Sequence, residues 1–338
     1  MKGFLNILLV SLVCFALFAC DNEVELSADY EDTTVVYGLI NANADTQFIK
    51  VNQAFLDGNT NALSLAQDPD RLFYDNLDVQ LRNLANNQLF PLDTISKPKE
   101  DGLFTNEKNI LYFTDTSLQA NTNYRIEVKQ SNGKLTYADA IALDTVSVVR
   151  PIIGRGRNQQ LSFTTSNGSI LDYNFTFRHS ARVAEFEVTL FFHYTERLAN
   201  GFEVPRAIPI SVGKVVNDRL IAQAAAKIEL PGRRFFETIA NSIDPNNTNP
   251  KILENDNPVS IEIYAADSEY RFYANLFGPI DGLTQVRPEY TNIENGIGLF
   301  ASRSRSLGRT TLATETNNQI RNGPITGNLG FQLRAGNP

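Results

Sequence analysis

The sequence has few of the residues that support covalent cross-links or acid–base chemistry. Its 338 residues include two cysteines, two histidines, one methionine and no tryptophan. Both cysteines, Cys14 and Cys20, lie within the first twenty residues. The rest of the chain therefore cannot close a disulfide within itself and must be stabilised by its core. This is feasible because a chain of this length buries about three quarters of its unfolded surface.

An excess of positive charge is also lacking. The chain has 30 basic and 38 acidic residues, which gives a formal net charge of −8 at pH 7. Proteins that bind nucleic acids or anionic membrane surfaces normally carry the opposite sign. The composition therefore argues against both kinds of partner.

The N-terminus has the layout of a secretory signal. Lys2 precedes an apolar core of about a dozen residues, which is too short to cross a bilayer and has no polar face. The core ends in Leu17-Phe18-Ala19-Cys20, which resembles the lipobox of bacterial lipoproteins. The resemblance implies a signal peptide at residues 1–19, acylation of Cys20 with a lipid such as palmitate, and a location in the outer membrane, on its periplasmic or cell-surface side.

An acidic stretch follows the lipidation site. Residues 20–32 begin Cys-Asp-Asn-Glu-Val-Glu and are expected to form a solvated tether. They also resemble the acidic export tag that follows the lipid cysteine in surface-exposed lipoproteins of Bacteroidota.

From residue 33 onward the pattern is that of short β-strands. Residues 34–40 are β-branched and aromatic, and apolar and polar residues alternate in 46–52, 77–82 and 124–129. Asn132-Gly133 separates the last of these segments from 134–138 and is a strong hairpin signal. The spacing predicts an immunoglobulin-like or transthyretin-like sandwich over residues 33–150.

The second half predicts another β-rich domain, over residues 151–309, with strands at 173–178, 184–194 and 259–264 and two short helices. The first helix, near 233–243, places four apolar residues on one face, and the second, near 268–277, follows a capping Asp267 or Ser268. We expect both apolar faces to pack in the core. The Asn- and Gly-rich residues 310–338 are expected to be mostly extended and irregular.

No pattern in the sequence indicates catalysis. His193 and Glu196 have a spacing that could hold a metal on a helix, but on a strand they face opposite sides. We therefore expect a surface or cross-strand histidine. Nucleophile elbows, phosphate-binding loops and dinucleotide fingerprints are absent, and Gly154–Arg157 lacks the Lys-Ser or Lys-Thr that a phosphate loop requires.

Two loops resemble calcium sites only in part. Asp57–Asn61 and Asp244–Asn249 place side-chain oxygens at alternate positions, but neither has the closing bidentate Glu. Both are interpreted as turns. The sequence thus predicts no metal, no cofactor and no catalytic residue, and it does not indicate which residues would bind a ligand.

One block carries a family resemblance. Tyr290–Ser302 reads YTNIENGIGLFAS and resembles the C-terminal block of a large family of Bacteroidota outer-membrane lipoproteins of unknown function. Val35–Ile40 and Asp101–Phe104 are similar to the same family, whereas the long tail after the block departs from it. Such lipoproteins are often encoded beside TonB-dependent transporters, so the resemblance implies such a transporter as a partner.

The same block also has a physical interpretation. Gly296 and Gly298 are expected to allow a bend or a close backbone approach. Ile297, Leu299 and Phe300 are expected to fill the core, and a ligand site in the block is the alternative.

Three functions remain open from the sequence. The first is a non-catalytic envelope lipoprotein that assists an outer-membrane importer by binding the transporter or its cargo. The second is an extracellular glycan hydrolase with paired carboxylates, which would require a cleft holding two of them about 5–10 Å apart. The third is a structural or adhesive envelope protein.

Overall fold

The computed structural model describes residues 33–54, 64, 66–98, 100, 102–106, 108–154, 158–253, 258–277 and 290–334. The signal peptide, Cys20, the acidic tether, Asp57–Asn61 and most of Gly154–Arg157 lie outside these residues. The fold is mainly β, as predicted; strands make up 48% and helices 14%. Among the described helices, none combines the length and the apolar character needed to span a membrane.

The first core lies between two sheets and forms the predicted sandwich. One sheet contains β1 (Thr34–Ile40), β2 (Gln47–Gln53), β6 (Ile110–Thr114) and β5 (Asp93–Ser96). The other has the order β4 (Leu89–Pro91), β3 (Leu77–Asn83), β7 (Thr122–Gln130) and β8 (Leu135–Ala142). The predicted hairpin joins β7 to β8, with Gly133 at φ 87°. Inward-facing residues of both sheets fill the space between them, among them Val36, Ile49, Leu81, Ile126 and Phe300.

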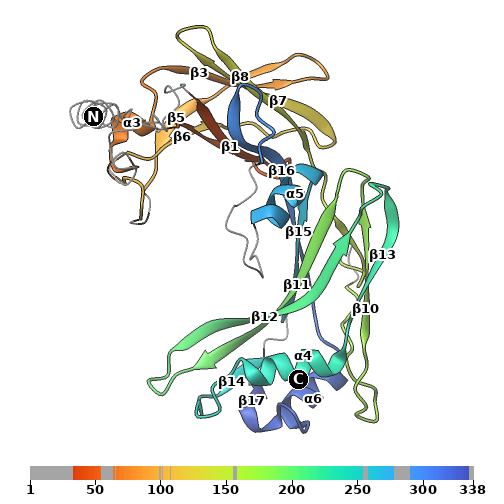
Figure 1. The fold of residues 1–338 in the computed structure, drawn as a ribbon. Coiled ribbons are helices and arrows are strands. Elements are labelled where there is room, and N and C mark those ends of the chain that lie inside the picture. Colours follow the sequence, from red (N-terminus) through yellow and green to blue (C-terminus); the bar gives the residue numbers. More distant parts are fainter. Residues whose placement is uncertain are drawn as a thin grey trace, which may run out of the picture.

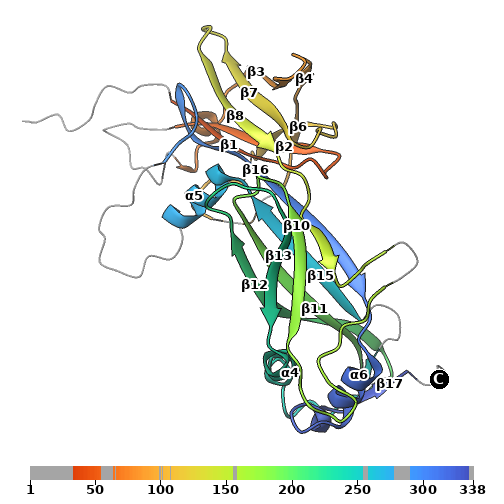
Figure 2. The ribbon, with the colours of Figure 1, turned by 90° about the vertical axis from the view of Figure 1, so that its right-hand side faces the viewer.

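The second core is larger, and Figure 2 shows the long strands that contribute to it. Its strands are β9 (Ser147–Arg150), β10 (Tyr173–His179), β11 (Glu185–Arg197), β12 (Glu203–Val216), β13 (Gln223–Leu230), β14 (Lys251–Leu253), β15 (Val259–Ala266) and β17 (Phe331–Leu333). Three of these pair as an additional sheet in the order β13-β10-β9. The interior is dominated by aromatic rings, among them Phe163, Phe175, Phe186, Phe192 and Phe235.

A single strand, β16 (Gly296–Thr310), joins the two cores. Its first half pairs in parallel with β1, from Gly296 opposite Thr34 to Ser302 opposite Ile40. Its second half pairs antiparallel with β15, from Arg303 to Thr310. The predicted domain ranges assign this strand to the second domain alone, whereas it contributes to both cores. Figure 1 shows the sandwich and the long sheet meeting at an angle at this strand.

The helices confirm part of the prediction and correct the rest. Helix α4 (Gly232–Asn241) buries Phe235, Phe236 and Ile239, as expected. Helix α5 (Ser268–Phe277) has the predicted bounds, and the Tyr270 N–H donates to Asp267 Oδ1 at 2.8 Å. None of its described residues is buried, however, so the prediction that its apolar face packs in the core was wrong. The periodicity of apolar residues predicts an apolar helix face, but it does not identify the surface against which that face packs.

Two further helices were not predicted. The short α3 (Pro69–Leu72) begins at Asp68, whose carboxylate accepts from the Asp70 N–H. Helix α6 (Thr314–Asn322) lies in the segment predicted to be irregular, and a 3-10 turn (Gly327–Leu329) follows it. Its asparagines are weak helix formers. The helix is held by tertiary contacts, since Ile320 is fully buried and the Thr316 hydroxyl accepts from the Phe163 N–H at 2.9 Å.

Candidate functional site

The C-terminal block forms the junction of β16 with β1. Gly298 has φ 122°, and a Cβ built on it would lie 2.1 Å from the Val36 carbonyl oxygen, so the two backbones touch where the sequence predicted a close approach. Phe300 is completely buried in the core of the sandwich, as expected. Leu299 is also buried, at 4% exposed, but it lies outside this core and lines the groove described below. Ile297, in contrast, is 44% exposed, and its prediction as a core residue was wrong.

The asparagines of the block have structural partners. The Asn292 side chain binds both backbone groups of Phe300, donating to its carbonyl at 2.7 Å and accepting from its N–H at 2.9 Å. The Asn295 side chain donates to the Leu135 carbonyl at 3.0 Å, and the Thr136 hydroxyl donates to the Asn295 carbonyl at 3.1 Å. The Asn292 bonds brace the block internally, and the bonds of Asn295 attach it to β8 of the other sheet. This favours the structural interpretation of the block over the ligand site.

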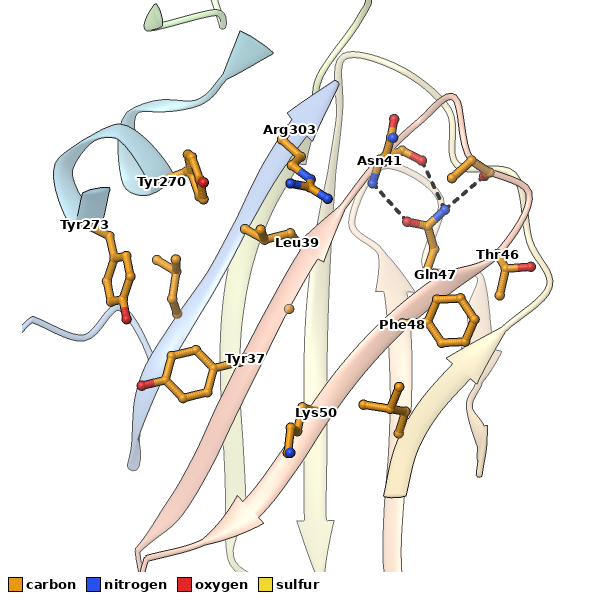
Figure 3. A pocket seen from close by; sticks show the side chains of 14 residues that line it. Tyr37, Leu39, Asn41, Thr46, Gln47, Phe48, Lys50, Tyr270, Tyr273 and Arg303 are labelled. Atoms are coloured by element: carbon orange, nitrogen blue, oxygen red, sulfur yellow. Dashed lines mark hydrogen bonds between the residues drawn. The ribbon is translucent and has the colours of Figure 1, made fainter. Parts of the chain in front are cut away.

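A groove lies on the opposite face of the same strands. Val36 and Ile40 of β1 point into the sandwich, so the alternation of a strand turns Tyr37 and Leu39 outward. On β2, Phe48 and Lys50 face outward for the same reason. Helix α5 overhangs this face and contributes Tyr270 and Tyr273, while β16 contributes Leu299 and Arg303 (Figure 3). The space between them has a volume of about 520 Å³. We call it the outer-face groove.

A second hollow adjoins the groove along the same two strands. It has a volume of about 460 Å³ and shares Tyr37 and Lys50 with the groove as a common wall. Its other walls are mostly apolar and include Val35, Leu72, Phe73 and Phe104. The two hollows therefore lie next to each other on the outside of the β1–β2 pair, with Tyr37 and Lys50 between them.

The groove combines exposed rings with positive charge. Tyr37, at the centre of β1, is 46% exposed, and Phe48, near the start of β2, is 38% exposed. Lys97 Nζ lies 3.7 Å from the centroid of the Phe48 ring, close enough for a cation–π interaction. Partial burial, together with the neighbouring Tyr273, raises the pKa of Tyr37. Within the described part of the chain, the residues lining the groove include Lys50 and Arg303 but no Asp or Glu.

His193 and Glu196 both lie on β11 and face opposite sides of it, as expected for a strand. His193 Nε2 is 2.8 Å from the Ser260 Oγ on β15, a cross-strand contact, and burial lowers the pKa of the imidazole. Glu196 points the other way and accepts hydrogen bonds from Asn249, Asn247 and Arg206. These bonds lower the pKa of Glu196 to about 2.

The same contacts show the loop at Asp244–Asn249 to be a turn. The amide groups of Asn247 and Asn249 donate to Glu196, and the carbonyl oxygens of both residues accept from Lys251 Nζ at 2.9 and 2.8 Å. Asp244 accepts from the Asn246 N–H at 2.9 Å. The Lys251 ammonium thus binds two loop carbonyl oxygens of the kind that a calcium ion would need as ligands. Among the described residues, no group of three or more His, Cys, Asp or Glu is arranged to hold a metal.

One hollow, of about 320 Å³, contains three carboxylates: Asp139, Asp267 and Glu269. Each of these carboxylates binds another group of the protein. Asp139 forms a two-pronged ion pair with Arg125, Asp267 accepts from the backbone N–H groups of Tyr270 and Ser302, and Glu269 accepts from the Tyr290 hydroxyl. A pair of catalytic carboxylates should be directed at a substrate, so this hollow gives the glycan-hydrolase hypothesis no specific support.

The outer-face groove was not predicted from the sequence. The period-two pattern places Tyr37, Phe48 and Lys50 on outward positions, which is the one signal that could have indicated it. The pairing of β16 with β1 brings the other lining residues to the groove: Leu299, Arg303, Tyr270 and Tyr273. No protein-family model matches the chain, and no curated protein sequence matches it.

Proposed function

We propose that this protein is a non-catalytic lipoprotein of the bacterial outer membrane, anchored through Cys20, that binds a protein partner in the outer-face groove. The observation that carries the proposal is the groove itself, with its half-exposed aromatic rings, its apolar floor and its lack of carboxylates among the described residues. Exposed contiguous apolar surface of this kind marks interaction sites. Aromatic and arginine side chains are also the residue types that dominate binding energy at interfaces.

An outer-membrane importer is the partner we propose. The resemblance of Tyr290–Ser302 to lipoproteins encoded beside TonB-dependent transporters supports it. A lipid anchor would also confine the protein to the plane in which such a transporter lies and raise their effective concentration toward each other. A stable interface needs roughly 800 Å² on each partner, so the contact would extend beyond the groove over the outside of the sandwich.

The anchor is tested first. Replacement of Cys20 by alanine should release the protein from the membrane fraction and abolish incorporation of labelled palmitate. Retention of the Cys20→Ala variant in the membrane, together with an unlabelled wild type, would refute lipidation.

The groove is tested by recovering partners of the lipidated protein in mild detergent. We expect a β-barrel protein to be enriched over an unrelated lipoprotein control and to be lost with the double variant Tyr37→Ala/Phe48→Ala. Both rings are substantially exposed, so their removal should leave the fold intact. The matched control is Phe202→Ala, which removes a 71% exposed ring from the turn between β11 and β12. Loss of the partner with the control as well, or with neither variant, contradicts the proposal.

A further inference from the structure

We infer that Asp267 is a proton-controlled latch that holds helix α5 over the outer-face groove. The latch consists of one buried carboxylate that joins the first turn of the helix to the strand beside the groove. Protonation of this side chain keeps the helix attached to the sheet, and loss of the proton favours its release. The inference rests on the proposed function, because it names how the groove that would bind the partner is regulated.

Asp267 binds the helix and the strand through its two carboxylate oxygens. Oδ1 accepts from the Tyr270 N–H at 2.8 Å on α5, and Oδ2 accepts from the Ser302 N–H at 2.7 Å on β16. The Asp267 N–H also donates to the Ser302 carbonyl at 3.1 Å. Ser302 is completely buried, and its hydroxyl donates to the Ile40 carbonyl at the end of β1. Asp267 therefore attaches α5 to the two strands that form part of the groove floor.

The other described contacts of α5 lie close to the surface. None of the described residues of the helix is buried. Phe272 and Tyr273 contact the Tyr290 ring, but Phe272 remains 52% exposed. Arg271 pairs with Asp218, whose side chain is 75% exposed, and exposed ion pairs contribute little to stability. Local opening costs least where few apolar contacts are buried, so α5 can detach while both cores stay folded.

Charged and titratable groups lie on the elements packed around the latch and the helix: Glu269 and Arg271 on α5, Asp139 on β8, Arg182 before β11, Glu185 on β11, Asp218 after β12, Tyr290 before β16 and Arg303 on β16. Burial is the main cause that raises the pKa of Asp267 to about 7, and the charge of Glu269 adds to it. The backbone N–H groups that bind the carboxylate act in the opposite direction.

The direction of control follows from proton counting. The attached state binds its proton with a pKa of about 7, whereas a hydrated aspartate has a pKa of about 3.9. Between these values, the attached helix holds a proton that the detached helix has released, so a rise in pH favours detachment. From pH 5 to pH 8, the equilibrium constant for detachment should rise roughly ten- to hundredfold.

Detachment changes the groove because α5 supplies one of its walls. Tyr270 and Tyr273 line the groove from the helix, and Tyr273 neighbours Tyr37 on its floor (Figure 3). Loss of this wall should weaken a partner that packs against the rings. The partner should therefore bind more tightly at pH 6 than at pH 8. By reciprocity, a bound partner should protect α5 from detachment.

Hydrogen exchange of the full chain in mild detergent, followed by mass spectrometry, tests the latch without any partner. A detached helix of about ten residues is marginal in water, so its amides exchange when it leaves the sheet. After correction for the intrinsic exchange rates, protection of residues 268–277 should fall roughly ten- to hundredfold from pH 5 to pH 8. At every pH it should remain well below the protection of β7 and β10, which report on the two cores.

Two variants separate the latch from a structural role of the same residue. Asp267→Asn does not titrate, so the protection of α5 should no longer depend on pH. Glu269→Gln keeps the carboxylate of Asp267 but removes the neighbouring charge, and it should move the midpoint of the pH response to lower pH. Glu237→Gln on α4 is the matched control, because Glu237 pairs with Arg233 at the surface, and its replacement should not move the midpoint.

Protection of α5 that does not change with pH, that equals the protection of the cores, or that changes in parallel in wild type and Asp267→Asn would overturn the inference. Failure of the proposed function gives a different result. If α5 responds to pH but no β-barrel partner is recovered, the proposed partner falls and the latch does not. If the partner is recovered and lost with Tyr37→Ala/Phe48→Ala while α5 shows no response to pH, only the latch falls.

Discussion

Replacement of Phe300 by alanine tests how the C-terminal block completes the sandwich. The ring is completely buried and lies opposite Gly38 in the parallel pairing of β16 with β1. A Cβ at position 38 would lie only 2.9 Å from Phe300 Cδ2 and 3.2 Å from Ile49 Cγ1. The ring therefore fills the space that the missing side chain of Gly38 leaves.

The expected cost follows from this packing. Truncation of a buried Phe to Ala costs about 3–5 kcal/mol, and the value rises when the surroundings cannot close the cavity. Gly38 has no side chain to move into the space, so we expect the upper half of the range. Gly38→Ala in the wild-type background should overpack the same site and cost about 1–3 kcal/mol.

The losses of stability caused by Gly38→Ala and Phe300→Ala should not be additive. In the double variant Gly38→Ala/Phe300→Ala, the new methyl group enters the cavity left by the ring, so the loss should be smaller than the sum by roughly 1 kcal/mol or more. Urea unfolding followed by circular dichroism measures all three variants, with Ile297→Ala on the same strand as the exposed control. Additive losses, or a Phe300→Ala protein that unfolds like the wild type, would refute this account of the packing.

Three other perturbations test separate features of the chain. Gly298→Ala should disrupt the β1–β16 pairing and lower the denaturation midpoint sharply, whereas Gly102→Ala, whose Cβ would have no neighbour within 4 Å, should not. Reductant should leave the melting temperature of the processed protein unchanged, and any shift would mean that Cys14 is retained or that chains are cross-linked. Glu196→Gln should remove stability at neutral pH, with the difference from wild type shrinking as the pH falls from about 4.5 toward 2. A difference that does not depend on pH would contradict the hydrogen-bond origin of the lowered pKa.

The strands could be predicted because each carries its own signal. Residues 77–82 alternate apolar and polar side chains, and β3 spans Leu77–Asn83. The helix at 268–277 was placed by the capping Asp267, a local feature. Local patterns are sufficient for such elements because the pleat and the helical turn repeat within a few residues.

The rest could not be predicted because it depends on contacts far apart in the chain. Pairing of β1 with β16 joins Thr34 to Gly296, across more than 250 residues, and no local pattern encodes a parallel partner. The outer-face groove depends on that pairing, since Arg303 enters it only from β16. Helix α6 is a similar case, because its own residues favour helix weakly and burial of Ile320 decides its conformation.

Asp267 was predicted as a helix cap, but its raised pKa depends on burial, which the sequence did not indicate. The sequence indicated only a helix cap, but the side chain is 7% exposed, and this burial raises its pKa to about 7 even though the N–H groups of Tyr270 and Ser302 stabilise the carboxylate. The charge of the nearby Glu269 raises the pKa of Asp267 further, whereas the Glu269 backbone N–H lowers it.

The direction of the resulting pH dependence follows from proton counting. Between about pH 4 and pH 7 the folded protein holds a proton at Asp267 that the unfolded chain has released, so the free energy of unfolding falls as the pH rises. Over about three pH units the loss amounts to roughly 4 kcal/mol. Asp267→Asn does not titrate and should flatten this slope, whatever its effect on absolute stability. Urea unfolding of both proteins at pH 5 and pH 8 measures the slopes. If the wild type and Asp267→Asn lose stability in parallel across this window, the slope originates elsewhere, and burial of Asp267 does not control it.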